Sequence, residues 1–379
     1  MKKIVVVPDS FKSTMSSAQV CEIMVRALKR HLDVDVVALP VADGGEGSVD
    51  AFLTAVGGKK VTMSVTGPLG EPVEGFYGLL NDGTAVVEMA VAAGLPLVKH
   101  ESGAESTTTY GVGELIVAAA RTGAKRIIVG LGGSATTDMG TGAAAAAGVR
   151  FFDEAGKEFV PLSGTLNLID RVDMSGLDSS VRDTEIQAMC DVDNPLFGPR
   201  GAAYVFGPQK GATPDVVEKL DQGLRHAFMV VERELLRHHE SIRSLADLKG
   251  AGAAGGMGTG MVAFFGATLH RGIDIVLDTV GFDSLLHDAD LIITGEGCLD
   301  TQSLDGKVVV GVARRARTHN VPVIAVVGDI CEGFEPVYEQ GVTAVFSTNT
   351  RAISFAEAQA FAAHDLDVTM DNIARLLSL

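Results

Sequence analysis

This 379-residue sequence lacks several features that mark other classes of protein. It contains no tryptophan, and aromatic residues make up only 5% of the chain, so a binding module built on aromatic platforms is not favoured. No apolar run approaches the ~18 residues of a membrane span, and the opening MKKIVVVPDS has too few apolar residues for a signal peptide. The four cysteines are widely spaced, which indicates a reduced, cytoplasmic protein; they are Cys21, Cys190, Cys298 and Cys331.

Positive charge is also scarce. The chain has 31 basic and 48 acidic residues, a net charge of −17, which disfavours partners such as nucleic acid or an anionic membrane. An anionic substrate would then need local lysines, arginines or a metal ion. The nine histidines are scattered without an H-E-x-x-H motif, so a zinc site is not expected. The signatures of P-loop ATPases, esterases and protein kinases are missing as well.

The sequence is rich in apolar residues, at 46%, and in glycine, with 45 residues. A short β-branched run recurs, and each run ends in a Gly- or Asp-rich turn before a helix-like stretch. The examples span residues 3–13, 36–47, 126–138, 188–195, 291–300 and 321–329. Continuous apolar strands alternating with helices predict an α/β fold with a largely parallel sheet covered on both faces. The carboxyl ends of such strands form the ligand crevice, so we expect the polar residues there to form the site.

Local patterns divide the chain into two expected domains. Residues 16–19 form a capping box before an amphipathic helix, and Thr213-Pro214-Asp215 begins a second helix. Residues 61–90, with a turn at Asn81-Asp82-Gly83, and residues 149–160 instead indicate antiparallel hairpins. We therefore expect a discontinuous parallel-sheet domain, residues 1–65 and 283–379, and an inserted mixed α/β domain, residues 66–282. The strand at 126–130 fits either domain.

Two glycine-rich loops are candidates for phosphate binding. GLGGSA at 130–135 follows a strand and matches G-x-G-x-x-A, with Asp153 roughly where a ribose-binding acid would lie. Against a nicotinamide site, Asp138 is expected in the next helical turn, facing any pyrophosphate, and Asp153 lies in a hairpin-like stretch. A nicotinamide site, another phosphate loop and a structural tight turn all remain open. GAGAAGGMGTG at 250–260 precedes a helix, so it indicates either an anion site at the helix N-terminus or close backbone packing.

Carboxylates and lysines follow five of the expected strands. Each acid alone is typical of a solvated or helix-capping residue, but five such turns on one edge of a sheet are a stronger signal. Glycine loops and lysines hold phosphates, while carboxylates hold Mg²⁺ and orient the attacking hydroxyl, so this combination is typical of phosphoryl transfer.

Eight short blocks follow one another along the chain: residues 8–12 (PDSFK), 43–47 (DGGEG), 66–70 (TGPLG), 132–135 (GGSA), 190–196 (CDVDNPL), 206–211 (FGPQKG), 252–256 (GAAGG), and 294–297 (TGEG) with 306–307 (GK). With these blocks in this order, the sequence resembles the type I glycerate kinases over essentially its whole length. Departures occur at Ser13, Thr137 and Met139, and at Cys298, where the family prefers arginine.

The resemblance implies a two-domain kinase with its active site in the cleft between a Rossmann-like domain and a mixed α/β domain. It implies that MgATP phosphorylates D-glycerate, most often to 2-phosphoglycerate, although some relatives form 3-phosphoglycerate. It also implies a role in glyoxylate, glucarate or galactarate breakdown. A homodimer is one expected assembly. The alternatives are an NAD-dependent oxidoreductase of a small hydroxy acid and a non-enzymatic sensor of an organic acid.

We assign each candidate residue an expected role. Asp191 is our choice for the general base, with Asp9 second, and three lysines would neutralise the substrate carboxylate and the phosphates. The candidates are, for catalysis, Asp191, Asp9, Lys307 and Lys12; for substrate binding, Ser10, Lys12, Asp43 and Lys210; for ATP, Gly132, Gly133, Ser134, Gly255, Gly256, Gly295 and Gly297; and for Mg²⁺, Asp43, Glu46, Glu296 and Asp300. Glu296 has a second interpretation, as the cap of the helix that follows it.

Overall fold

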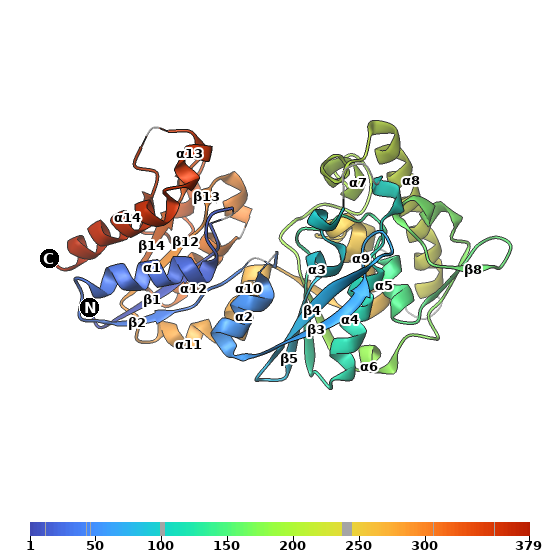
Figure 1. The fold of residues 1–379 in the computed structure, drawn as a ribbon, viewed down its shortest axis with the longest axis horizontal. Helices are drawn as coiled ribbons and strands as arrows, with labels where there is room; N and C mark the ends of the chain where they lie inside the picture. Colours follow the sequence, from blue (N-terminus) through green and yellow to red (C-terminus); the bar gives the residue numbers. More distant parts are fainter. Residues whose placement is uncertain are drawn as a thin grey trace. The chain divides into compact units, whose positions relative to one another are not determined.

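The computed structural model describes residues 1–379 apart from 12, 43, 46, 99–102, 237–244, 306 and 352, and apart from the side chains of residues 302, 305 and 355. The chain forms two compact units (Figure 1). Unit 1 comprises Met1–Asp43, Asp50–Gly57 and Arg271–Leu379, and unit 2 comprises Gly44–Val49 and Gly58–His270. No helix in this described part of the chain is long and apolar enough to cross a membrane.

Unit 1 is built on the expected parallel sheet. Its strand order is β16-β14-β12-β1-β2, and every pairing is parallel. The strands are β1 (Lys3–Pro8), β2 (Asp35–Ala38), β12 (Leu291–Gly295), β14 (Val323–Val327) and β16 (Ala344–Ser347). All residues of β12 and β14 are buried, as expected for central strands covered on both faces. The parallel-sheet prediction is therefore confirmed for this unit.

Helices α1 (Ser17–Lys29) and α14 (Ala362–Leu377) pack against each other and against one face of this sheet. The predicted capping box is present, because Gln19 N donates to Ser16 Oγ and Ser16 N donates to Gln19 Oε1. The unit also contains α10 (Gly272–Thr279), α11 (Phe282–Leu286), α12 (Val308–Thr318) and α13 (Phe355–Gln359), with short 3₁₀ turns η7 (Thr301–Asp305) and η8 (Glu335–Tyr338). Helix α2 (Ser48–Val56) starts in the segment that belongs to unit 2.

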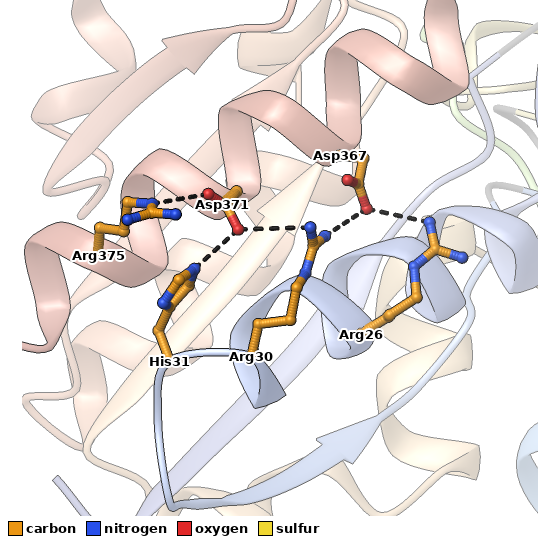
Figure 2. A network of polar contacts seen from close by, with 6 residues as sticks. All are labelled: Arg26, Arg30, His31, Asp367, Asp371 and Arg375. Carbon is orange, nitrogen blue, oxygen red and sulfur yellow. Dashed lines mark hydrogen bonds and ion pairs between the residues drawn. The ribbon is translucent and has the colours of Figure 1, made fainter.

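A network of ion pairs ties the end of α1 to α14 (Figure 2). Two carboxylates of α14 alternate with basic side chains: Asp367 accepts from Arg26 and Arg30, and Asp371 contacts Arg30, His31 and Arg375. The hydrogen bonds from Arg375 and His31 lower the pKa of Asp371 to about 2. Exposed ion pairs individually add little stability, so the apolar contact between α1 and α14 contributes most of the stability of their packing.

Unit 2 is built on a mixed six-stranded sheet, as expected for the inserted domain. Its order is β11-β10-β6-β5-β4-β3, with the first four strands parallel and β4 and β3 antiparallel to their neighbours. The strands are β3 (Gly58–Thr66), β4 (Pro72–Leu80), β5 (Thr84–Glu88), β6 (Arg126–Gly130), β10 (Glu185–Met189) and β11 (Thr268–His270). The strand at 126–130, which the sequence left unassigned, is a central strand here. The hairpin predicted at residues 81–83 is confirmed between β4 and β5.

A small antiparallel sheet lies beside this core. It consists of β7 (Arg150–Phe152), β8 (Glu158–Phe159) and β9 (Arg171–Asp173), which confirms the hairpin predicted at 149–160. The helices are α3 (Met89–Ala93), α4 (Tyr110–Arg121), α5 (Thr141–Ala146), α6 (Ser179–Arg182), α7 (Ala202–Phe206), α8 (Pro214–Leu235) and α9 (Ala253–Phe265). Helix α8 begins as predicted, with Thr213 as N-cap and proline in the first turn.

The limits of the two units differ from the domain boundaries expected near residues 65 and 282. Strand β3 starts at Gly58 and pairs along its whole length with β4, so it belongs to unit 2. At the other junction, α10 and α11 pack against α12, so the chain from Arg271 belongs to unit 1.

Candidate active site

In unit 1 the candidate residues lie where β1, β12 and β14 end. Backbone hydrogen bonds continue the ladder past the strands: Asp9 N donates to Gly295 O at 2.8 Å, and Asp329 N donates to Gly297 O at 3.0 Å. Gly328 N donates to Glu296 O at 3.1 Å in the same way. The residues that follow three neighbouring strands, including Asp9, Glu296 and Asp329, are thus joined by their backbones at one edge of the sheet.

The carboxylates at this edge differ in burial and in partners. Asp9 and Glu296 are only 6% and 5% exposed, although ionised carboxylates are rarely buried without a specific reason. Asp9 Oδ1 accepts a hydrogen bond from Ser10 N at 2.6 Å. Asp300 Oδ1 accepts from Ser303 N at 3.0 Å in the first turn of η7. Asp300 thus accepts from the first turn of η7, and the helix-capping interpretation of Glu296 stays a prediction.

The glycines at this edge are required by close packing. A Cβ on Gly295 would lie 2.1 Å from Val326 O, and a Cβ on Gly328 would lie 2.4 Å from Gly297 O. The backbones at the ends of β12 and β14 and just beyond them approach each other too closely for side chains at Gly295 and Gly328. This packing explains the glycines by itself, so contact of Gly295 or Gly297 with a nucleotide stays a prediction.

A cavity of about 140 Å³ opens beside this edge. Of the predicted site residues, Gly297 lines it, together with polar side chains that the sequence analysis did not select. Its lining comes from the segments after β1, β12, β14 and β16 and from α13 and α14, and includes Thr14, Asp329, Thr348 and Asn349. The sequence pattern at 321–329 predicted a strand here, but the single acid at its end, Asp329, did not by itself indicate a site.

In unit 2 the structure brings Lys210 and Ser134 together. Lys210 ends the 3₁₀ turn η5 (Pro208–Lys210) and is only 7% exposed. Its Nζ donates to Ser134 Oγ at 2.9 Å and to Thr136 O at 2.6 Å, in the loop that follows β6. Burial lowers the pKa of Lys210 to about 7, and the nearby Asp138 opposes that shift. A lysine in this state can gain a proton when an anion binds beside it.

Asp138 does not face a phosphate site, contrary to the expectation. Helix α5 begins only at Thr141, and the Asp138 carboxyl is fully buried before it. It accepts hydrogen bonds from Thr109 N and Thr109 Oγ1, both at 2.8 Å, from Gly140 N at 3.1 Å and from Gly142 N at 3.3 Å. Burial raises the pKa of Asp138 while these four donors oppose the shift. The carboxyl therefore organises the loop and the start of α4.

The two glycine-rich loops of unit 2 pack against other backbone segments. A Cβ on Gly132 would lie 2.7 Å from Gly45 Cα, and a Cβ on Gly255 would lie 1.9 Å from Thr136 O. Gly255 and Gly256 also have φ of +69° and +88°, so regular helical geometry in α9 resumes only after them. The close-packing interpretation accounts for these glycines. A nucleotide contact at Gly132, Gly133, Gly255 or Gly256 stays a prediction.

Asp191 follows β10 and is partly exposed. The preceding Cys190 N donates to His270 O at 2.8 Å, which extends the pairing of β10 with β11. Burial raises the pKa of Cys190 to about 11, with smaller contributions from Asp191 and Asp193. The position of Asp191 at a strand end agrees with the expected arrangement, but its role as a base is untested.

Glu88 is a buried acid that the sequence analysis missed. It ends β5, and its carboxylate accepts from Val49 N at 2.6 Å and from Gly47 N at 3.1 Å. Glu88 thereby fixes the backbone from Gly47, the last residue of the DGGEG run, to the start of α2. The sequence feature that could have identified Glu88 is its place as the acid that ends the apolar run TAVVE, residues 84–88.

The remaining candidates are divided between the units or lie outside the described residues. Lys307 belongs to unit 1 and precedes α12, where its carbonyl accepts from Gly311 N at 2.8 Å. Lys12, Asp43 and Glu46 lie outside the described residues. Asp9, Ser10, Gly295, Glu296, Gly297, Asp300 and Lys307 are in unit 1, whereas Gly132, Gly133, Ser134, Asp191, Lys210, Gly255 and Gly256 are in unit 2. A shared site in an interdomain cleft stays a prediction.

Carboxylate oxygens are the ligands that Mg²⁺ prefers, and Glu296 and Asp300 offer them. Among the described residues, however, no group of three or more His, Cys, Asp and Glu side chains is arranged to hold a metal ion. The described part of the expected set is therefore not a complete resident metal site.

Comparison with known proteins finds similar chains over the full length. The sequence model of the glycerate kinase family matches residues 4–378. The glycerate kinase of Bacillus subtilis (strain 168) is 45% identical over 100% of this chain and 98% of its own length. The glycerate 2-kinase of Escherichia coli (strain K12) is 42% identical over 100% of this chain and 98% of its own length. A crystal structure from Salmonella typhimurium LT2, of a protein assigned as glycerate kinase 2, covers 99% of this chain and 98% of its own at a TM-score of 0.87 and 42% identity.

Proposed function

Because the chain belongs to the glycerate kinase family and is an ATP-dependent kinase, we propose that it phosphorylates the 2-hydroxyl of D-glycerate to give 2-phosphoglycerate. The observation that carries the choice of hydroxyl is the full-length similarity to the Escherichia coli protein named glycerate 2-kinase. A 3-phosphoglycerate product is the remaining kinase alternative. Family membership leaves the NAD-dependent oxidoreductase and the sensor without support.

The site residues are proposed to act from both units. In unit 1, the residues that would contact glycerate or the transferred phosphoryl group are Asp9, Ser10, Lys12 and Lys307. The buried Glu296 lies at the same edge of the sheet and would supply a carboxylate to Mg²⁺. In unit 2, Asp191 would take the proton of the attacking hydroxyl, and Lys210 with Ser134 would bind an anionic group. The support is the place of Asp9, Ser10, Glu296 and Asp191 after strands, together with the direct Lys210–Ser134 contact.

Magnesium is proposed as part of the MgATP substrate. Glu296 and Asp300, with Asp43 and Glu46, would supply carboxylates to it, directly or through water, and the ion would neutralise phosphate charge. The described residues alone do not form such a site, so the proposal depends on Asp43 and Glu46. A cytoplasmic location and a homodimer remain predictions.

An enolase-coupled assay tests the choice of product. The purified chain receives D-glycerate and MgATP together with excess enolase, which converts 2-phosphoglycerate but not 3-phosphoglycerate to phosphoenolpyruvate. The proposal expects the ultraviolet absorbance of phosphoenolpyruvate to increase at the rate at which ADP forms. ADP formation without phosphoenolpyruvate would indicate 3-phosphoglycerate. If phosphoenolpyruvate then forms when phosphoglycerate mutase is added, 3-phosphoglycerate is established as the product.

Two substitutions test the assignment of roles. Asp191→Asn and Lys307→Ala are each expected to lower kcat by about 10²-fold or more, because they remove a base and a charge that acts on the phosphoryl group. Asp193→Asn is the matched control, since Asp193 is exposed and paired with Lys249 at 2.9 Å. Near-normal turnover in both test variants would contradict the assignment.

A further inference from the structure

Two of the four cysteines face each other in unit 1, beside the edge of the sheet where Glu296 and Asp329 lie. Cys298 Sγ and Cys331 Sγ are 2.8 Å apart, although the residues are 33 positions apart in sequence. A disulfide bond is ~2.05 Å long, so the sulfur atoms are about 0.8 Å beyond bonding distance. In the reduced form the same contact serves as a thiol–thiol hydrogen bond.

Backbone pairing holds the two thiols in this position. Cys298 lies in β13 (Cys298–Leu299), which pairs in parallel with β15 (Asp329–Ile330), and Cys298 is opposite Asp329. Cys331 N donates to Leu299 O at 2.9 Å, which continues the ladder by one residue. Side chains two residues apart share a face of a strand, so Cys298 and Cys331 project to the same side.

The pair is accessible and lies in an acidic environment. Both cysteines are partly exposed, whereas Cys21 is buried. Asp300 and Asp329 flank them, so an anionic oxidant is repelled and a neutral one is favoured. Cys298 stands where the resemblance leads one to expect arginine, so the pair is a feature of this chain and not one that the resemblance implies.

We propose that Cys298 and Cys331 form a reversible dithiol–disulfide couple whose disulfide fastens the segment after β12 to the segment after β14. The first thiol attacks a small neutral disulfide RS–SR, forming a mixed disulfide and releasing one RSH. The second thiol then attacks the protein sulfur of that mixed disulfide and releases the second RSH. The protein loses two hydrogen atoms and is oxidised, and one RS–SR is reduced to two RSH.

Burial, the hydrogen bond to Cys331 and the carboxylates of Asp300 and Asp329 raise the pKa of Cys298 to about 12. We therefore expect slow exchange at neutral pH, and the test measures its extent at equilibrium. The full chain is incubated with excess 2-hydroxyethyl disulfide, free thiols are alkylated under denaturing conditions, and tryptic peptides are identified by mass. Cys298 lies in peptide 272–307 and Cys331 in peptide 318–351.

The expected result is a link between these two peptides, with a mass about 2 Da below the sum of the two unmodified peptides, and loss of the link on treatment with dithiothreitol. Cys190→Ser is the matched control and should form the same link, because Cys190 Sγ contacts the carbonyls of Val192 and Gly250 and not a sulfur. Cys331→Ser should form none. Separate mixed disulfides on Cys298 and Cys331, or a link that involves Cys190, would overturn the proposal.

Thermal unfolding provides a readout that does not depend on the peptide map. Closing the loop between Cys298 and Cys331 restricts the unfolded chain, so the oxidised wild type should melt several degrees above the reduced wild type. Oxidant should not shift the melting temperature of Cys331→Ser. Equal melting temperatures for cross-linked and reduced wild type would contradict the fastening role.

Discussion

Replacing Lys210 by methionine should remove a pH dependence of stability that the wild-type chain shows. Methionine keeps much of the buried stem but cannot titrate. In the folded chain the pKa of Lys210 is about 7, against an ordinary value of 10.5. Between these values the unfolded chain binds more protons than the folded chain, so the free energy of unfolding rises with pH.

The size of the effect follows from the two pKa values. Below pH 7 the folded chain carries the full cost of a buried charged lysine, and that cost declines as the pH rises toward 10.5. Integrating the difference in bound protons predicts that, between pH 6 and pH 9, the free energy of unfolding of wild type rises by about 2–3 kcal/mol relative to that of Lys210→Met. Loss of the hydrogen bonds to Ser134 and Thr136 shifts the difference by an amount that does not depend on this titration, so the free energy of unfolding still rises with pH.

Urea unfolding at a series of pH values measures this difference directly. Wild type and Lys210→Met are compared at pH 6, 7, 8 and 9, so that groups common to both chains cancel. Lys249→Met is the matched control, because Lys249 is exposed and pairs with Asp193 at the surface. A difference between wild type and Lys210→Met that stays constant from pH 6 to pH 9 would refute the depressed pKa.

Three further results are expected from the structure. Gly255→Ala should lower the free energy of unfolding by about 2–4 kcal/mol in thermal or urea unfolding, because its Cβ meets backbone. Gly123→Ala should lower the free energy of unfolding by only about 1 kcal/mol, because φ is +82° but no atom lies within 4 Å of the added Cβ. Equal losses for Gly255→Ala and Gly123→Ala would argue against the packing explanation. Asp138→Ala should cost about 3 kcal/mol or more in the same assay, because buried donors lose their acceptor; a neutral effect would contradict the enclosed carboxyl. In ¹³C NMR titrations, Arg375→Ala should raise the pKa of Asp371 from about 2 toward the ordinary range, and an unchanged value would remove Arg375 as the main cause.

The fold was largely predictable because its signals are local. Continuous apolar strands, the Ser16 capping box and the Thr213-Pro214 helix start depend on residues close in sequence. The strand at 126–130 could not be assigned, because its neighbours β5 and β10 lie far away along the chain. The sequence also could not fix which elements border each unit, since that depends on pairing partners such as β4.

The site was less predictable because its chemistry depends on contacts over long separations. The Lys210–Ser134 contact joins residues 76 positions apart and was expected only as two separate members of a resemblance. Asp138 looked like an acid that would face phosphate, but its donors include Thr109, 29 positions away. Glu88 was not selected, because its donors Gly47 and Val49 lie 41 and 39 positions away in the sequence. The glycine loops could be phosphate sites or packing sites until the distances around Gly132 and Gly255 were known.

Proton-coupled ³¹P NMR of the reaction with D-glycerate and MgATP tests the central claim most directly. Phosphorus on the 2-oxygen couples to one carbon-bound hydrogen, and phosphorus on the 3-oxygen couples to two. The account predicts a new phosphomonoester doublet that matches authentic 2-phosphoglycerate and grows as the γ-phosphate signal of ATP declines. A triplet would contradict the 2-hydroxyl assignment, and loss of ATP signal to inorganic phosphate alone would contradict glycerate as the acceptor.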